Sequence, residues 1–421
     1  MLEKLYARRR FGIRPGVERV RLILERLGHP ERSFPSIHVV GTNGKGSTSA
    51  FLSSMLGAAG LRTALFTSPH LVNFSERFRI DGQEPAPERL EALLGTVLAQ
   101  APAEATFFEI VTALACLHFA EERAEVAVME AGMGGKSDAT AVIPALMTVI
   151  SPIGLDHCDY LGASLARIAA EKGGIAEPET AVITAGQPVE AREEILRICR
   201  AGANRLIREG DDFSAVWGDD GLLGYHGLCT ELSNLTPGIP GRYQAQNAAL
   251  ALAAAETFGA AAGTPVPPHA LDAGIRTARW PGRMELIPGS RPLLLDGAHN
   301  PAGAAALAAA LGDYRYRRLL MVAGVMSDKD VPAMFAPLVG KVHHAYAVTP
   351  AVERALDDGA LAGILDGLGF PATACGSVGN GIDAACREAG KDDLILVCGS
   401  LFTVGEYKAR LAGQPFEGIR G

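Results

Sequence analysis

The 421-residue chain has few cysteines, no long apolar run and only a modest excess of one charge. Its seven cysteines are an odd number and none forms a CxxC pair, which favours a reducing compartment over a disulfide scaffold. The opening residues, MLEKLYARRR, contain no apolar signal core, and no apolar run is long enough to cross a bilayer. We therefore expect a cytoplasmic protein that has no membrane partner.

The charge balance excludes another class of partner. A net charge of −8 and a pI near 5.7 argue against a general nucleic-acid binder. Hydrophobic residues make up 48% of the chain and charged residues 20%, as in globular proteins with an ample core. There is no internal repeat and no low-complexity tract. The length predicts two domains.

One stretch organises the chain: an apolar strand-like run over residues 36–40 meets a glycine-dense turn and then a helix-compatible segment. This is the order of a phosphate-binding P-loop, in which glycines let anions approach backbone N–H groups and Lys45 supplies a positive charge. The motif differs from the common P-loop pattern GxxxxGK[ST], because Gly46 separates the lysine from the hydroxyl-bearing residues. The alternative is a glycine-rich turn with a surface lysine. The predicted nucleotide-binding residues are Gly41, Thr42, Asn43, Gly44, Lys45, Gly46, Ser47 and Thr48.

Strands and helices alternate along most of the chain, which predicts an α/β fold with mainly parallel sheets. We expect a P-loop ATPase-like domain over residues 1–278 and a smaller Rossmann-like domain over 279–421. The boundary falls before the break Trp-Pro-Gly at 280–282. The predicted strands are 36–40, 62–67, 125–130, 145–151, 291–296, 317–324, 341–348, 371–375 and 393–398. The predicted helices are 88–100, 106–122, 164–175, 242–258, 301–312, 331–338, 352–367, 380–389 and 401–412, and small antiparallel strands are expected within 211–235.

Polar residues follow several predicted strands of the first domain, at the sheet edge where α/β proteins bind ligands. Glu130 closes an apolar strand and is followed by glycines, while Ser68 and His157 follow other strands. A Mg²⁺ ion bound to ATP phosphates would pair with such a carboxylate. Lys172 lies on the predicted helix 164–175 and is a further candidate for this site. The alternatives are a structural salt bridge for Glu130, a packed or surface histidine for His157 and a solvated charge for Lys172.

Several blocks make the chain resemble the folylpolyglutamate synthases and bifunctional dihydrofolate/folylpolyglutamate synthases of the Mur ligase superfamily. The likeness begins at FGIRPG (11–16) and ends at CGSLF (398–402). The blocks between them are GTNGKGST (41–48), TSPHLVNFSERFRIDG (67–82), MEAGMGGKSDAT (129–140), GLDHCDYLG (154–162), AAEKGGI (169–175), WPGRMEL (280–286) and DGAHNP (296–301). The SPHL and DGAHNP segments point to the folate branch.

The resemblance implies roles for the metal-site residues. Ser68, Glu130 and His157 match ligands of two magnesium ions that also bind ATP, and the lysine matching Lys172 is typically carbamylated. A carbamate turns a cation into a further carboxylate, which requires a lysine that can lose its proton. The alternative is an unmodified Lys172 paired with a carboxylate or phosphate.

The resemblance also implies contacts from both domains. Asn247 matches a residue that contacts the nucleotide, and Arg283 matches an arginine that reaches the triphosphate. Asp296 and His299 match residues that position ATP and glutamate. Each of these could instead order a loop. Lys45, Lys172, His157, Arg283, Asp296 and His299 form the predicted catalytic set.

Two further residues are candidates for substrate binding. Ser400 is a candidate for the glutamate carboxylate, and Phe108, with the 68–77 loop, for the pterin. Aromatic side chains more often serve a core. One position departs from the family, which usually has asparagine where this chain has Ala141.

The predicted activity is an ATP-dependent ligation through an acyl phosphate. L-glutamate would be added to dihydropteroate, to the γ-carboxylate of a reduced folate, or to both, and the family suggests a monomer. A cell-wall Mur ligase is a rival, but it would need a nucleotide-sugar domain, and only 40 residues precede Gly41. A P-loop regulatory module without ligase activity is a rival of another class.

Overall fold

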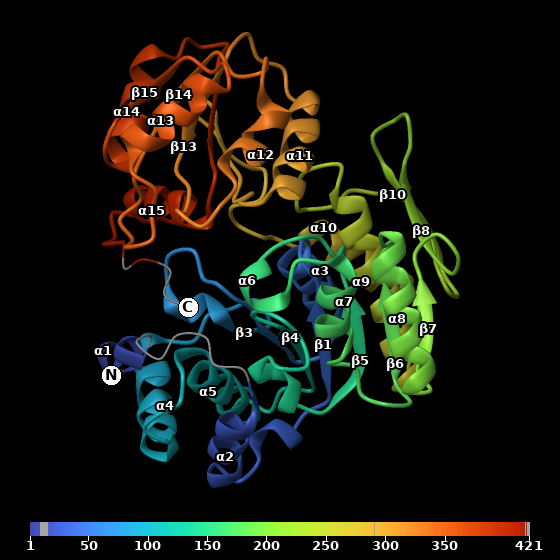
Figure 1. The fold of residues 1–421 in the computed structure, drawn as a ribbon. Coiled ribbons are helices and arrows are strands. Elements are labelled where there is room, and N and C mark those ends of the chain that lie inside the picture. Colours follow the sequence, from blue (N-terminus) through green and yellow to red (C-terminus); the bar gives the residue numbers. More distant parts are fainter. Residues whose placement is uncertain (9–15, 290, 417, 419–421) are drawn as a thin grey trace.

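The structure is a computed structural model that describes residues 1–8, 16–289, 291–416 and 418 (Figure 1). Residues 11–15 of the FGIRPG block lie outside the described residues. The chain forms two lobes, one above the other in Figure 1, with the C-terminal helices and strands in the upper lobe. We call the part from α1 to α10 the N-terminal lobe and the part from β11 to α15 the C-terminal lobe.

The N-terminal lobe is built on a seven-stranded sheet in the order β3-β2-β4-β1-β5-β6-β7. All neighbours are parallel except β3, which pairs antiparallel with β2. The strands are β1 (Ser36–Val40), β2 (Thr63–Phe66), β3 (Phe78–Ile80), β4 (Val126–Glu130), β5 (Ala145–Ile150), β6 (Ala181–Thr184) and β7 (Arg205–Arg208).

Helices cover both faces of this sheet, which explains why the central strands β1 and β4 are buried at every position and mostly apolar. On β4, Val126 and Val128 face the core beneath α3, α9 and α10, whereas Ala127 and Met129 face the core beneath α2, α4 and α5. A third cluster joins α7 and α8 to β5 and β6. The helices are α1 (Leu2–Tyr6), α2 (Glu18–Arg26), α3 (Lys45–Ala58), α4 (Pro87–Gln100), α5 (Phe107–Glu121), α6 (Cys158–Leu161), α7 (Leu165–Gly173), α8 (Val189–Ala201), α9 (Gln244–Ala261) and α10 (Pro268–Thr277).

A small antiparallel sheet lies at the side of this lobe, in the order β10-β9-β8. It consists of β8 (Ser214–Trp217), β9 (Leu223–His226) and β10 (Glu231–Leu235). Residues 218–221 lie in the connection between the antiparallel strands β8 and β9, so the expectation of small antiparallel strands within 211–235 is confirmed.

The C-terminal lobe has a six-stranded sheet in the order β11-β12-β16-β13-β14-β15, parallel except for the edge strand β11. Its strands are β11 (Glu285–Ile287), β12 (Leu293–Leu295), β13 (Leu319–Ala323), β14 (His344–Ala347), β15 (Ala372–Ala374) and β16 (Leu394–Cys398). The helices α11 (Pro301–Ala310), α12 (Val331–Phe335), α13 (Asp358–Gly367), α14 (Val378–Glu388) and α15 (Leu401–Leu411) pack over separate cores on its two faces.

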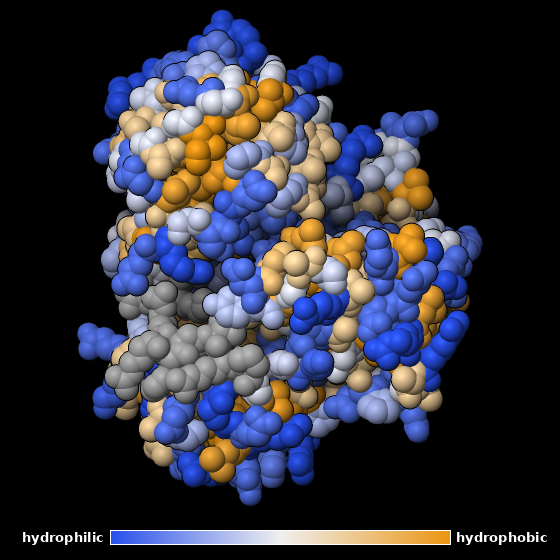
Figure 2. Space-filling view, viewed as in Figure 1, coloured by the Kyte–Doolittle hydropathy of each residue, from blue (hydrophilic) through white to orange (hydrophobic). Residues whose placement is uncertain are grey.

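The predicted α/β class, with two mainly parallel sheets, is confirmed. The division at residues 278 and 279 stays a prediction. Hydrophilic residues cover most of the face shown in Figure 2, and hydrophobic residues form separate patches there. No helix in the described part of the chain is long and apolar enough to span a membrane.

Candidate active site

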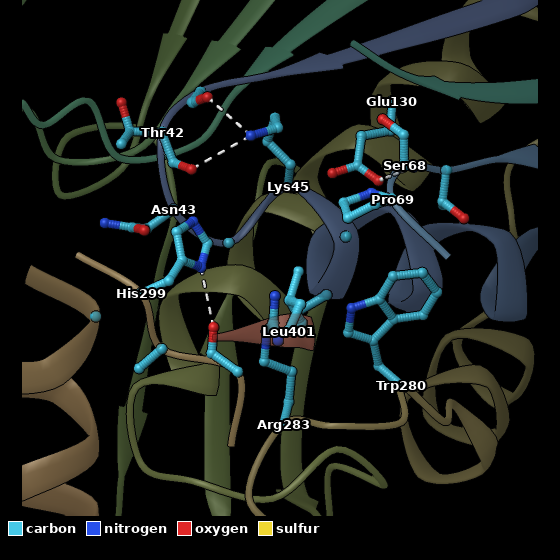
Figure 3. A pocket seen from close by; sticks show the side chains of 18 of the residues that line it. Thr42, Asn43, Lys45, Ser68, Pro69, Glu130, Trp280, Arg283, His299 and Leu401 are labelled. Carbon is cyan, nitrogen blue, oxygen red and sulfur yellow. Dashed lines mark hydrogen bonds between the residues drawn. The ribbon is translucent and has the colours of Figure 1, made fainter. Parts of the chain in front are cut away.

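A cavity of about 360 Å³ lies where the two lobes meet, beyond the carboxyl ends of β1, β4 and β5. In Figure 3 the P-loop, Ser68 and Glu130 lie on one side of it, and Trp280 and Arg283 on the other. Most of the predicted site residues line this cavity: residues 41–47, Ser68, Glu130, His157, Lys172, Asn247, Arg283, Asp296 and His299.

The P-loop connects β1 to α3. Gly41 and Gly44 have φ values of 143° and 86°, which only glycine adopts without strain, and Gly44 is the N-cap of α3. The Lys45 ammonium donates to the carbonyl oxygens of Gly41 and Thr42 at 3.2 and 3.3 Å (Figure 3). A helix N-terminus, exposed backbone N–H groups and a lysine together make a site for anions such as phosphates.

Glu130 ends β4 beside the P-loop, because β4 pairs with β1 in a register that sets Val39 opposite Glu130. The residue is only 4% exposed, and burial raises the pKa of its carboxyl to about 7, against the lowering effect of Lys45. The Ser68 backbone N–H donates to this carboxylate at 3.2 Å. A cation supplied with a nucleotide would compensate the buried negative charge.

His157 lies on the exposed rim, at the N-cap of α6, with a positive φ of 51°. Its neighbour Asp156, which the sequence analysis missed, is the centre of a polar cluster between the lobes. The Asp156 carboxylate accepts from Lys329 at 3.0 Å and from the Asn300 amide at 3.1 Å, and it lies 3.7 Å from His299 Nε2. Burial alone would raise the pKa of Asp156, but the charges of His157, His299 and Lys329 lower it below its usual range.

Lys172 projects from α7 and is 4% exposed. Burial, with the nearby charge of Lys45, lowers the pKa of its ammonium group to about 7. The glycine-rich loop after β4 lies directly on this part of α7: a Cβ at Gly135 would be 2.5 Å from the Lys172 Cα. At neutral pH a large fraction of the Lys172 side chain is therefore an uncharged amine.

The remaining predicted residues of the cavity are held by hydrogen bonds. The Asn247 amide donates to Gln244 at 2.8 Å. Asp296 is buried and accepts from the backbone N–H groups of Met284 and Ala298 and from the Tyr243 hydroxyl. Burial raises the pKa of its carboxyl, against the lowering effect of the Arg283 charge. The His299 ring makes a 2.9 Å hydrogen bond with the Gly297 carbonyl oxygen, shown dashed in Figure 3.

Three predicted residues lie outside the cavity lining. The Thr48 hydroxyl is buried in α3 and has no hydrogen-bond partner in the part of the chain that is described, whereas Ser47 lines the cavity and accepts from Gln244. Phe108 lies behind Gly132 and against the Phe66 ring. The Ser400 hydroxyl caps α15 by accepting from the Thr403 N–H at 3.1 Å.

The donor set limits how a metal could bind. Among the described residues, no group of three or more His, Cys, Asp and Glu side chains could by itself hold a metal ion. The predicted set contains only two such side chains, Glu130 and His157, and adds the Ser68 hydroxyl. These ligands therefore fit Mg²⁺ only together with phosphate oxygens or water, which is the way Mg²⁺ commonly binds in nucleotide-dependent enzymes.

Comparisons with known proteins agree with this geometry. The Mur ligase middle domain matches residues 39–255, and the Mur ligase glutamate ligase domain matches residues 282–401. The dihydrofolate synthase/folylpolyglutamate synthase of Bacillus subtilis is 32% identical, with 97% of each chain covered. The chain belongs to the dihydrofolate synthase/folylpolyglutamate synthase family. The predicted family and the class of ATP-dependent ligase are thus confirmed, and the comparisons favour them over a cell-wall ligase or a regulatory module.

Other matches extend this result. A probable bifunctional folylpolyglutamate synthase/dihydropteroate synthase of Halobacterium salinarum is 35% identical over 96% of the chain, which spans about half (50%) of that protein. A structure of Escherichia coli FolC in complex with DHPP and ADP has a TM-score of 0.90 and 32% identity, with 98% and 97% of the two chains covered. A Yersinia pestis bifunctional synthase complexed with AMPPNP and a Mn ion has a TM-score of 0.86 and 30% identity, with coverages of 95% and 94%.

Proposed function

We propose that this protein is an ATP-dependent amide ligase that adds L-glutamate to dihydropteroate, to the γ-carboxylate of a reduced folate, or to both. One observation carries the proposal: the P-loop, Glu130, Lys172 and Arg283 line a single cavity between two lobes that match the two Mur ligase domains. ADP in the complex of the related Escherichia coli protein supports a nucleotide here.

In the first step, an oxygen of the substrate carboxylate attacks the γ-phosphorus of ATP. The bond between that phosphorus and the β,γ-bridging oxygen breaks, which releases ADP and leaves an acyl phosphate. Lys45 from the N-terminal lobe and Arg283 from the segment that leads into the C-terminal lobe would stabilise the charge on the transferring group.

In the second step, the uncharged amine of glutamate attacks the acyl carbon. The carbon–oxygen bond to phosphate breaks, inorganic phosphate leaves with its electron pair, and the amine proton passes to solvent or phosphate. An acyl phosphate is needed because a carboxylate oxygen is a very poor leaving group. Since the site is formed by both lobes, their closure would keep water from the acyl phosphate.

Two magnesium ions are part of the proposal. Glu130, Ser68 and His157 would hold them together with the phosphates, and magnesium would neutralise phosphate charge. The buried, readily deprotonated Lys172 suits carbamylation, which would add a carboxylate near the metal. The Mn ion with AMPPNP in the Yersinia pestis structure supports a divalent metal.

For the substrate sites, Asn247, Arg283 and Asp296 are proposed to contact the nucleotide and His299 the glutamate, because all four line the cavity. Phe108 and Ser400 are less favoured, since their side chains are engaged outside it. We also propose domains over residues 1–278 and 279–421, supported by the two sheets, and a monomer, supported by a site built from one chain.

The test is ADP release by the purified chain with Mg·ATP and L-glutamate, given dihydropteroate or tetrahydrofolate in parallel. Glutamate-dependent turnover with both acceptors would establish both activities, and turnover with one would identify the single activity. ATP binding without turnover on either acceptor would overturn the proposal.

A further inference from the structure

Trp280 lies in the segment between α10 and β11 and packs against the P-loop. A Cβ atom at Gly46 would be 2.7 Å from the indole Cζ2 and 2.8 Å from Cε2 and Nε1, and these are its three nearest neighbours. Such distances are shorter than real Cβ contacts allow. The indole therefore occupies the space that a side chain at position 46 would need.

The backbone does not require glycine at this position. Gly46 is the second residue of α3 and is not among the residues with positive φ, unlike Gly41 and Gly44. In the common P-loop pattern GxxxxGK[ST], the residue after the lysine is serine or threonine, so phosphate binding tolerates a side chain there. The contact with Trp280 thus accounts for the glycine that sets this loop apart from the common pattern.

The indole also contacts a residue on β3, the edge strand of the N-terminal sheet. The guanidinium carbon of Arg79, on β3, lies 5.7 Å from the centre of the Trp280 ring, within the range of a cation–π contact. Trp280 packs against the hydrophobic core of the N-terminal lobe, although the chain leaves that lobe immediately after it. In Figure 3 Trp280 and Arg283 rise from the same segment toward the P-loop side of the cavity.

The other end of this segment is attached to the C-terminal lobe. The Met284 N–H donates to buried Asp296 at 3.0 Å, and Met284 has a positive φ of 44°. Gly297 leaves room for Arg283, because a Cβ there would be 2.4 Å from the arginine Nη1. Arg283 therefore lies in a segment that contacts the P-loop through Trp280 and contacts Asp296 of the C-terminal lobe through Met284.

We propose that Trp280 is a positioning residue of the ligase: its indole packs on Gly46 and thereby fixes the distance between Arg283 and the phosphate-binding loop. The position of the segment that joins the lobes then follows the position of the P-loop. This inference rests on the proposed function only in assigning Arg283 to the phosphates. The competing explanation is that Trp280 merely fills the core.

The two explanations differ in whether kcat falls in variants that remain folded, and two substitutions together test the contact itself. Gly46→Ala adds a methyl group that clashes with the indole, and Trp280→Ala removes the indole. The double variant has the methyl group but no clash. We expect each single variant to lose about 10-fold or more in kcat, and the double variant to lose no more than Trp280→Ala alone. Trp280→Phe, which keeps an aromatic ring, should recover part of the loss.

Gly57→Ala is the matched control, because Gly57 lies on the same helix and a Cβ there meets nothing within 4 Å. It should leave activity unchanged. The ATP dissociation constant of each variant is measured as well, because ATP binding does not depend on folate turnover. If the wild-type chain binds ATP but does not ligate, the proposed function is refuted, and the ATP affinities of the variants still test the role of Trp280. Melting temperatures show that each variant is folded.

Two results would overturn the inference. One is an additive double variant, about 100-fold slower than wild type if each single loss is 10-fold, because the methyl group would then act without the indole. The other is folded Trp280→Ala with wild-type kcat and ATP affinity. A non-additive loss with normal folding would support it.

Discussion

Lys172→Arg is the substitution that most clearly separates a carbamylated lysine from an unmodified one. Arginine keeps a long side chain and a positive charge, but its guanidinium does not lose a proton in proteins and so cannot form a carbamate. If Lys172 served only as a cation beside carboxylates or phosphates, the variant would keep much of its activity. The proposed function predicts that it does not.

The size of the effect follows from the burial of Lys172. With a pKa of about 7 instead of 10.5, about 90% of the amine is uncharged at pH 8, against about 0.3% for an ordinary lysine. Carbamate formation by CO₂ needs the uncharged amine, so Lys172 is favoured about 300-fold over an exposed lysine. We expect Lys172→Arg to lower kcat by about 100-fold or more, the loss expected for a displaced metal and its electrostatic stabilisation.

The assay has two parts. Glutamate-dependent ADP release gives kcat, and ¹³C NMR after equilibration with ¹³C-bicarbonate should show a carbamate signal in the wild type that is absent from Lys172→Arg. Lys136→Arg is the control, since Lys136 is exposed and pairs only distantly with Glu171, at 3.8 Å. Activity within a few-fold of wild type in Lys172→Arg, or no carbamate signal in active wild type, would refute the reasoning.

The same pKa makes a prediction about stability. In CO₂-free buffer the unfolded chain binds the Lys172 proton up to about pH 10.5 while the folded chain releases it near pH 7, so unfolding free energy rises with pH between these values. Between pH 7 and 9 the rise is about 2 kcal/mol, and Lys172→Met should remove it in denaturant titrations. An unchanged slope in that variant would mean that Lys172 is not the group responsible.

Three further predictions follow from other contacts. Glu130→Gln should keep the fold but lower kcat about 100-fold and raise the Mg²⁺ concentration needed for half-maximal activity; an unchanged Mg²⁺ titration would argue against a metal role. Lys329→Met should weaken the contact between the lobes by leaving the low-pKa Asp156 carboxylate with one partner fewer, lowering both the melting temperature and, about 10-fold, kcat; a lower melting temperature with unchanged kcat would show a purely structural ion pair. Gly274→Ala should destabilise the protein by about 1–3 kcal/mol in denaturant titrations, because its Cβ would lie 2.3 Å from the Met55 Cα on α3, and a neutral result would contradict this close helix packing.

Much of the fold could be predicted from the sequence, because parallel strands buried on both faces form continuous apolar runs. The strand before the P-loop was predicted over residues 36–40, as β1 has it, and Glu130 was predicted to end a strand, as it ends β4. The region containing β6, β7 and α8 received no assignment. The edge strands β3 and β11, which pair antiparallel with their neighbours, also received no assignment.

The site residues that follow strands could be predicted from the sequence. Those whose position depends on packing between the lobes could be predicted less well. The P-loop, Ser68, Glu130 and His157 come together because carboxyl ends of parallel strands share one edge. Asp156 and Lys329 are far apart in sequence, and only the arrangement of the lobes joins them. One signal for Asp156 was present, since it precedes His157 within the GLDH block.

Local capping and packing also escaped a pattern-based interpretation. The Ser400 hydroxyl is engaged as the N-cap of α15, a common role for serine before a helix, and this position could have been recognised from Ser400 and the apolar residues after it. The sequence shows that Gly46 is unusual in the loop. Only the structure shows that the indole of Trp280, more than 200 residues later, fills the space that a side chain at position 46 would need.

The most direct test of the central claim is ADP release by the purified chain with Mg·ATP, with and without L-glutamate, on dihydropteroate and on tetrahydrofolate. The proposed ligase releases ADP only when an acceptor and glutamate are both present, and forms one amide for each ADP, measured as glutamate-extended product by mass spectrometry. ADP release that is independent of acceptor and glutamate, or no release from folded protein that binds ATP, would contradict it.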